Sequence, residues 1–351
     1  MRKVFAVLLL FTFSFLSVSA QEDAQFTLFP WAQLYYNPGS AGEQHNTLCF
    51  TALFRQQYLG YKDVWVPTGT GNTSNQLNAD GLQTMNTGGQ QILFNMETYL
   101  RKLHGGLGLS VVKDKNGIFE NVGVRLGYSY KVNLPVGRLG IGAQVGFLNQ
   151  SIDKEAYRPL QDGDPLIEQL KNSESFMDLD FNFGLFYKAP TFYVGLSATQ
   201  LATSIRISGD ETLLKPSRTI YLHGGYIWTI PWNPSWNIEP QAVLKTNLAT
   251  MQLDLMVLAR YDGLLWGGVS YRIDDAFSLL FGTRPFYNSS DAYLKGLDVG
   301  LSYSFTTSKL GYRKYRSFGD IELVVRYCFD IYKPEVFTGY GSTRNIYKNQ
   351  Y

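Results

Sequence analysis

Long stretches in which apolar and polar residues alternate are the feature that most constrains what this chain can fold into. From Asn121 to Leu134 the even positions are apolar or aromatic, and the odd positions are polar, charged or glycine. Successive side chains of a β-strand point to opposite faces, so this period predicts a strand with one apolar and one polar face. The same alternation recurs over residues 139–147, 177–187, 253–261, 297–305 and 321–329. The sequence therefore predicts an all-β fold.

The predicted strands suit a transmembrane barrel better than a soluble core. Their polar face carries charged pairs such as Asp178 and Asp180, which suit a wet lumen, while the apolar face meets lipid. At roughly 10 to 13 residues, the strands are long enough to cross a membrane at a tilt. Only 17% of the residues are charged, compared with about a quarter in soluble proteins. A soluble sandwich or a lipocalin-like barrel, whose strands also alternate, is the alternative interpretation.

We predict an antiparallel up-and-down barrel of about 14 strands, an even number that is typical of bacterial barrels with both termini in the periplasm. Such barrels have short periplasmic turns and longer outer loops. The first half of the chain follows this rule, with long connections at residues 59–87, 113–120, 151–175 and 201–217. The rule weakens in the second half, where residues 247–250 and 273–275 form tight connections. The strand register after residue 247 therefore stays open.

The beginning of the chain has the pattern of a secretory signal peptide. A basic start leads into an apolar run that ends in Ser17-Val18-Ser19-Ala20, which predicts cleavage before Gln21. The run is shorter than the roughly 20 residues that span a bilayer, and no later stretch is apolar enough for a membrane helix. The sequence thus predicts an integral outer-membrane protein with both termini in the periplasm. Its parts are a signal peptide (1–20), a periplasmic N-terminal segment (21–45), the barrel (46–329) and a periplasmic C-terminal tail (330–351).

Few patterns in the chain point to chemistry. The three histidines, His45, His104 and His223, have no metal-ligand spacing to one another or to a cysteine. There is no G-x-S-x-G motif and no phosphate-binding glycine loop, and a net charge of +2 without a basic block gives no sign of nucleic-acid binding. We predict a protein that is not an enzyme and has no catalytic, metal or cofactor residues. The catalytic alternative requires a Ser or Asp beside a His, and His223 is the nearest candidate.

The two cysteines fall in the first and the last predicted strands. Closure of a barrel makes these strands neighbours, and alternation places both Cys49 and Cys328 on the inward face near the periplasmic rim. We predict that the two residues lie close together and form a candidate disulfide. The alternative is two isolated small residues.

Two segments outside the predicted strands are candidates for recognition. The C-terminal tail combines basic residues with aromatic ones, a mixture suited to docking a partner strand or peptide. The candidate docking residues are Tyr332, Phe337, Tyr340, Tyr347 and Tyr351. The alternative for this tail is a frayed chain end. The segment from Tyr35 to Gly42, with its Asn-Pro turn, is expected to pack at the periplasmic rim or in the lumen.

Several sequence blocks, taken in order, resemble the PorP/SprF family. They begin with Gln25-Phe26-Thr27 and Tyr36-Asn37-Pro38-Gly39-Ser40-Ala41-Gly42, and continue through Leu265-Trp266-Gly267-Gly268-Val269-Ser270-Tyr271-Arg272. The last block, from Gly300 to Leu323, departs from the family where Gly319-Asp320-Ile321 replaces the usual Ser-His-Glu. The likeness covers residues 25–329.

The resemblance implies a non-enzymatic outer-membrane component of the type IX secretion system, the export route linked to gliding motility in Bacteroidetes. Such a protein supports secretion or cell-surface attachment of cargo with a C-terminal sorting domain. Its implied partners are that cargo, periplasmic ring or peptidoglycan-linked components, and the lipid of the outer membrane. The family brings no catalytic residues. An outer-membrane channel or substrate-specific porin is the alternative function.

Overall fold

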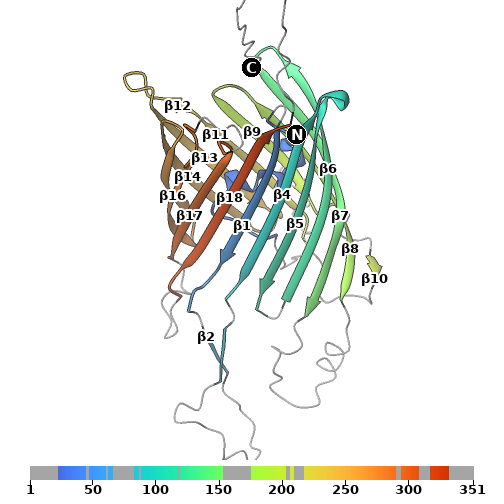
Figure 1. The fold of residues 1–351 in the computed structure, drawn as a ribbon. Coiled ribbons are helices and arrows are strands. Elements are labelled where there is room, and N and C mark those ends of the chain that lie inside the picture. The colour runs from blue at the N-terminus through green and yellow to red at the C-terminus, as the bar shows by residue number, and fades with distance from the viewer. Residues whose placement is uncertain are drawn as a thin grey trace, which may run out of the picture.

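Antiparallel strands form a closed barrel in the computed structural model (Figure 1). The structure describes residues 23–44, 47–60, 62–65, 83–86, 88–117, 119–152, 175–202, 206–208, 217–289, 294–307 and 317–331. The barrel strands are β1 (Thr47–Gln56), β4 (Gln90–Leu100), β5 (Gly105–Asn116), β6 (Phe119–Leu134), β7 (Gly137–Ile152), β8 (Phe176–Lys188), β9 (Phe192–Thr199), β11 (Thr219–Tyr226), β13 (Trp236–Thr246), β14 (Met251–Tyr261), β15 (Leu265–Arg272), β16 (Ala276–Thr283), β17 (Leu297–Thr306) and β18 (Asp320–Asp330). Each strand pairs with the next one, and β18 pairs with β1 to close the ring.

Four shorter strands stand apart from this ring. The strand β10 (Arg206–Ser208) pairs with β8 and β12 (Trp228–Thr229) pairs with β13, whereas β2 (Lys62–Trp65) and β3 (Gln83–Asn86) form a separate hairpin. None of the helices among the described residues is long and apolar enough to cross a membrane.

The predicted number of barrel strands is confirmed, and the predicted strand bounds differ from the observed ones by a few residues. The register that the sequence left open is regular, because β13 to β18 pair in order without a break. We call the end of the barrel where β1 begins and β18 ends the terminal rim, which lies at the top of Figure 1. The other end is the opposite rim. Residues 247–250 and 273–275 are tight turns at the opposite rim, where the long connections also lie.

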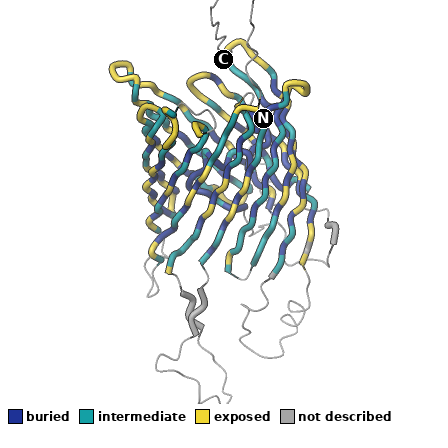
Figure 2. The backbone as a smooth tube through the Cα atoms, in the orientation of Figure 1, coloured by how far each residue is buried: buried dark blue, intermediate teal, exposed yellow. Residues whose placement is uncertain are grey.

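Side chains alternate between the two faces of the barrel wall as the sequence predicts. On β6, Val124 and Leu126 are exposed on the outer face, whereas Arg125 and Ser129 are completely buried on the inner face. Figure 2 shows this alternation as bands along most strands. A soluble protein buries its apolar residues and exposes its charges, so the reverse arrangement indicates an outer face that meets lipid.

The N-terminal segment lies inside the barrel. Residues 23–44, which we call the plug, contain the 3₁₀ turns η2 (Phe29–Trp31) and η3 (Pro38–Ser40) and the short helix α2 (Gln33–Tyr36). Most of the plug is buried against the barrel wall. The sequence predicts a periplasmic segment at residues 21–45, with the stretch from Tyr35 to Gly42 at the periplasmic rim or in the lumen. The structure places this stretch in the lumen together with residues 23–34, because part of the inner wall is apolar and the apolar residues of the plug cover it.

A disulfide joins the first and the last strands of the barrel. Cys49 and Cys328 face each other directly in the register of β1 and β18, and their sulfur atoms are bonded. The bond links positions separated by 279 residues in the sequence. It therefore fastens the closing seam near the terminal rim.

Candidate functional site

The apolar residues of the plug form one buried cluster with residues of β1, β4, β5, β11, β13 to β16 and β18. The ring of Trp31 lies 4.6 Å from that of Trp266, and the ring of Tyr36 stacks on that of Tyr221 at 5.4 Å. Trp266 itself is held by a hydrogen bond of 2.8 Å that its indole Nε1 donates to Asp298. Burying each such side chain contributes about 1.5–3 kcal/mol. These contacts form an apolar core inside the barrel.

The turn formed by Asn37, Pro38 and Gly39 fixes the plug to the opposite wall. Asn37 is fully buried, and its Nδ2 donates to the carbonyl of Leu185 at 3.0 Å. Its Oδ1 accepts a hydrogen bond of 2.9 Å from the backbone N–H of Gly39. The wall strands carry glycine where the turn approaches. A Cβ at Gly142 would collide with the backbone of Pro38, which explains why this part of the wall lacks side chains.

His223 belongs to this plug contact. Its Nε2 lies 2.9 Å from Nδ2 of Asn37, and because the amide nitrogen can only donate, the imidazole accepts there. The ring is buried and stacks on Phe186. The partner of His223 is therefore an amide, and neither a Ser nor an Asp is seen as its hydrogen-bond partner among the described residues.

A cluster of polar side chains holds the first described residue of the plug. The carboxylate of Asp23 accepts hydrogen bonds from Thr199 at 2.9 Å, Gln200 at 2.6 Å and Tyr221 at 3.2 Å. Arg125 lies 3.6 Å from the same carboxylate and pairs with Asp180 at 2.5 Å. Thr199 is the last residue of β9, so Asp23 lies toward the opposite rim.

A buried glutamate ties the plug to the closing seam. The two carboxylate oxygens of Glu322 on β18 accept hydrogen bonds from the backbone N–H groups of Thr27 at 2.7 Å and Leu28 at 2.9 Å. Arg55 on β1 pairs with Asp320 at 2.6 Å and also donates to the carbonyl of Gln25. Hydrogen bonds to charged groups contribute about 1.5–3 kcal/mol each. Plug docking and seam pairing therefore share the same residues.

Glu43 anchors the other end of the plug at the terminal rim. Its carboxylate lies 2.9 Å from Arg138, 3.3 Å from Lys131 and 3.9 Å from Lys188. Burial raises the pKa of the Glu43 carboxyl, but the nearby cations lower it more, so the pKa lies below its usual value. Arg138 is the second residue of β7 and Lys188 is the last residue of β8, so this anchor lies at the terminal rim.

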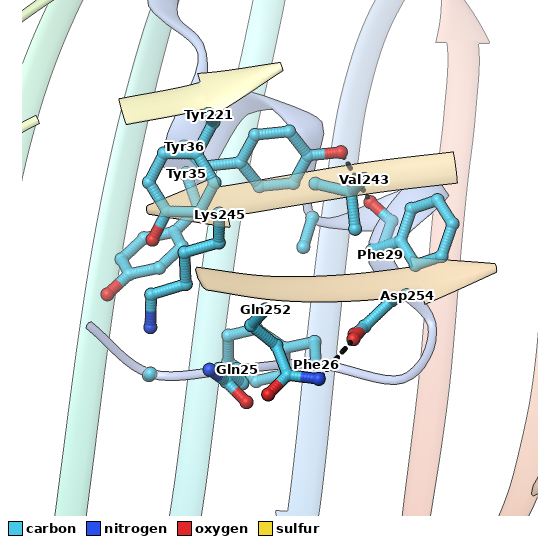
Figure 3. A pocket seen from close by; sticks show the side chains of 12 residues that line it. Gln25, Phe26, Phe29, Tyr35, Tyr36, Tyr221, Val243, Lys245, Gln252 and Asp254 are labelled. Carbon is cyan, nitrogen blue, oxygen red and sulfur yellow. Dashed lines mark hydrogen bonds between the residues drawn. The ribbon is translucent and has the colours of Figure 1, made fainter. Parts of the chain in front are cut away.

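Small cavities lie beside the plug in the part of the chain that the structure describes. Cavities of about 40, 20 and 80 Å³ border the plug and the inner wall. Figure 3 shows the first, which lies between the plug residues Phe26, Phe29 and Tyr36 and the wall residues Val243 and Lys245. A single water molecule needs roughly 10–15 Å³ of such volume. The smallest of these cavities therefore has room for one water molecule and the largest for several.

The remaining residues singled out in the sequence are distributed as follows. The five candidate docking residues of the tail lie outside the described residues. Asp178 and Asp180 are both buried on the inner face, where Asp180 serves the Arg125 pair. Among the described residues, no group of three or more His, Cys, Asp or Glu side chains could hold a metal ion. Sequence reasoning missed the plug contacts, although Met256 and Leu258 on the polar face of β14 were a signal of an apolar inner wall.

Residues 18–327 match the family described as type IX secretion system membrane protein PorP/SprF. No curated protein matches the chain.

Solved structures of outer-membrane channels are similar in fold. The Pseudomonas putida toluene transporter TodX has 14% identity and a TM-score of 0.48, with 86% of this chain and 94% of that chain covered. A TodX mutant described as a monoaromatic hydrocarbon channel has 13% identity and a TM-score of 0.49, covering 85% of this chain and 94% of that one. For the Acinetobacter baumannii outer membrane protein Omp33 the identity is 8%, the TM-score 0.40, and the coverage 82% and 100%.

Proposed function

The chain belongs to the PorP/SprF family of type IX secretion system membrane proteins, and from this premise we propose that it acts as a docking component of that system in the outer membrane. In this role it holds cargo with a C-terminal sorting domain, or periplasmic ring or peptidoglycan-linked components, at the end of the barrel. The terminal rim, where β1 begins and β18 ends, faces the periplasm. The protein carries out no chemical reaction.

The plug is the observation that supports docking over conduction. A secretion conduit or a porin needs a continuous water-filled path, whereas residues 23–44 occupy the lumen and are anchored by Asp23, Asn37 and Glu43. Their contacts involve strands on both sides of the barrel. With the lumen filled and the outer wall in lipid, the rims and the C-terminal tail are the surfaces left for protein partners.

The tail is the first surface to test. The tail combines five aromatic residues with basic ones, a mixture that suits recognition of an extended segment. The aromatic residues are Tyr332, Phe337, Tyr340, Tyr347 and Tyr351. The experiment is affinity purification of the tagged full-length protein from detergent-solubilised envelopes, followed by mass spectrometry. A variant with these aromatics replaced by serine is compared with a control variant that carries Asn349→Ala and Gln350→Ala in the same tail.

We expect the wild type and the control to recover periplasmic secretion components or sorting-domain cargo, and the serine variant to lose them while its barrel stays folded. Equal recovery with all three proteins would reject the tail as the docking surface. Recovery of the barrel alone from the wild type, together with ion conductance in planar bilayers, would reject the docking function and favour a channel.

A further inference from the structure

Among the described residues, a groove lies in the outer wall of the barrel near the terminal rim. Trp236, Tyr261, Leu265 and Phe281 border it, and it encloses a volume of about 440 Å³. This volume lies in the range of roughly 300–1,000 Å³ that is typical of ligand sites. The bordering side chains are apolar or aromatic and well exposed, with Phe281 62% exposed. The groove is therefore an apolar depression in the face that meets the membrane.

Two small residues make the floor of the groove. Ala259 on β14 pairs with Gly267 on β15, which in turn pairs with Phe281 on β16. The next outward-facing pair toward the terminal rim is Tyr261 and Leu265. Large side chains therefore border a place where the wall residues have only a methyl group or no side chain.

The glycine at position 267 is not explained by packing within the chain. A Cβ at the neighbouring Gly268 would collide with the carbonyl of Val257, and at Gly282 or Gly300 it would collide with the ring of Trp266. A Cβ at Gly267 would meet only the carbonyl oxygen of Leu280, at 3.4 Å, an ordinary contact. Glycine weakens a strand interior, and it marks a bulge, a tight bend of a barrel, or a site where a ligand or another backbone approaches closely. The register of β14, β15 and β16 is unbroken at Gly267, so no bulge explains this glycine, and the open space beside it leaves room for a ligand.

The position of the groove indicates which ligand fits. Trp236 begins β13 and Tyr261 ends β14, and their rings lie 4.9 Å apart at the terminal rim. Aromatic residues at this level mark the membrane–water interface. Ala259 lies two residues further along the strand, about 7 Å from the rim at 3.3–3.4 Å per residue. The floor of the groove is thus at the depth where lipid chains begin.

The hairpin above the groove belongs to the same interface. It contains β12 and rises at the upper left of Figure 1. Residues 226–236 include no charged side chain, and Trp232 is 79% exposed. Tryptophan is favoured at the headgroup level of a membrane. A continuous apolar and aromatic surface therefore runs from this hairpin to the floor of the groove.

We propose that the groove binds one acyl chain of a phospholipid, in the membrane leaflet at the terminal rim. The chain lies on Ala259 and Gly267 beside Phe281, and the Trp236–Tyr261 pair packs near its headgroup end. The source is a phospholipid, rather than lipopolysaccharide, because we assign the terminal rim to the periplasmic side. This site lies outside the lumen and does not depend on the docking role of the tail.

The test fills the groove and compares an identical substitution elsewhere on the lipid face. Ala259→Leu and Gly267→Leu place a branched side chain in the groove, whereas Ala52→Leu adds the same side chain to an exposed position on β1. The full-length proteins are released from nanodiscs of phosphatidylethanolamine and phosphatidylglycerol, and native mass spectrometry measures the retained lipid. Heat modifiability on gels checks that each barrel is folded.

We expect the wild type and Ala52→Leu to retain one phospholipid, and both groove variants to lose occupancy by about tenfold, which corresponds to about 1.4 kcal/mol. Equal phospholipid retention by all four proteins would overturn the proposal. Protein isolated from native membranes that retains lipopolysaccharide or a protein partner in place of phospholipid would overturn it as well.

A second measurement places the lipid in the groove. Vesicles of the same phospholipids with brominated acyl chains quench the fluorescence of nearby tryptophans. The wild type should be quenched more strongly than Ala259→Leu, and Trp236→Phe should remove most of this difference. A difference that persists in the Trp236→Phe background would assign the quenching to another tryptophan and count against the site.

Discussion

The replacement Asn37→Ala should loosen the plug without unfolding the barrel. The Asn37 side chain is 0% exposed. It makes hydrogen bonds with the carbonyl of Leu185, the imidazole of His223 and the N–H of Gly39. Each contributes about 0.5–1.5 kcal/mol net, so the loss of all three costs about 3 kcal/mol. Because about 1.4 kcal/mol is a factor of ten, plug opening should become about a hundredfold more frequent.

Hydrogen exchange measured by mass spectrometry reports this opening, because amides in a locally unfolding segment exchange at a rate set by its free energy. Peptides covering residues 26–42 should exchange faster in Asn37→Ala, while strand peptides stay protected. Asn247→Ala is the matched control, since Asn247 caps an exposed turn at the opposite rim through Ala249 and Thr250. If the plug amides of Asn37→Ala exchanged at the same rate as those of the wild type, the view that this turn fixes the plug would be refuted.

Three further predictions concern other contacts of the plug and the seam. Trp31→Ala should lower the stability of the docked plug by about 3–5 kcal/mol, because it leaves a cavity beside Trp266. The same variant should raise ion conductance in planar bilayers. Replacing Cys49 and Cys328 by serine should lower stability by about 2–4 kcal/mol and make the unfolding temperature independent of reductant, while the strand pairing persists. Since the pKa of Glu43 is lowered in the folded state, its charge stabilises the plug above the unfolded pKa, and this contribution is lost as pH falls through the folded pKa. Glu43→Gln should therefore loosen the plug at neutral pH and weaken the acid dependence of plug exchange.

The barrel could be predicted from the sequence because its wall has a strong local signal. Alternation identifies each strand, and closure of the ring then makes the first and last strands neighbours. Cys49 and Cys328 illustrate how far this reasoning extends, because the structure pairs the two residues directly. The residue pairing follows from register alone and needs no knowledge of side-chain packing.

The plug could not be placed in the same way. Its turns and one short helix have no period, and their position depends on contacts with residues up to 295 positions away, as for Thr27 and Glu322. Alternation distinguishes the inner from the outer face but does not say what fills the lumen. The apolar residues Met256 and Leu258 on the inner face were the local sign that something apolar must cover them.

The plug connects opposite walls of the barrel, and this connection bears on docking. Gly39 is hydrogen-bonded to β6 and Asn37 to β8. On the other side of the barrel, Trp31 packs against Trp266 on β15, and the backbone of Thr27 and Leu28 donates to Glu322 on β18. A strand barrel with a wet lumen resists deformation only through its ring of backbone hydrogen bonds. Here side-chain contacts across the lumen add direct links between strands that are not neighbours. These links make the barrel stiffer than an unfilled ring of the same strands, and stiffness is what the docking role proposed above requires.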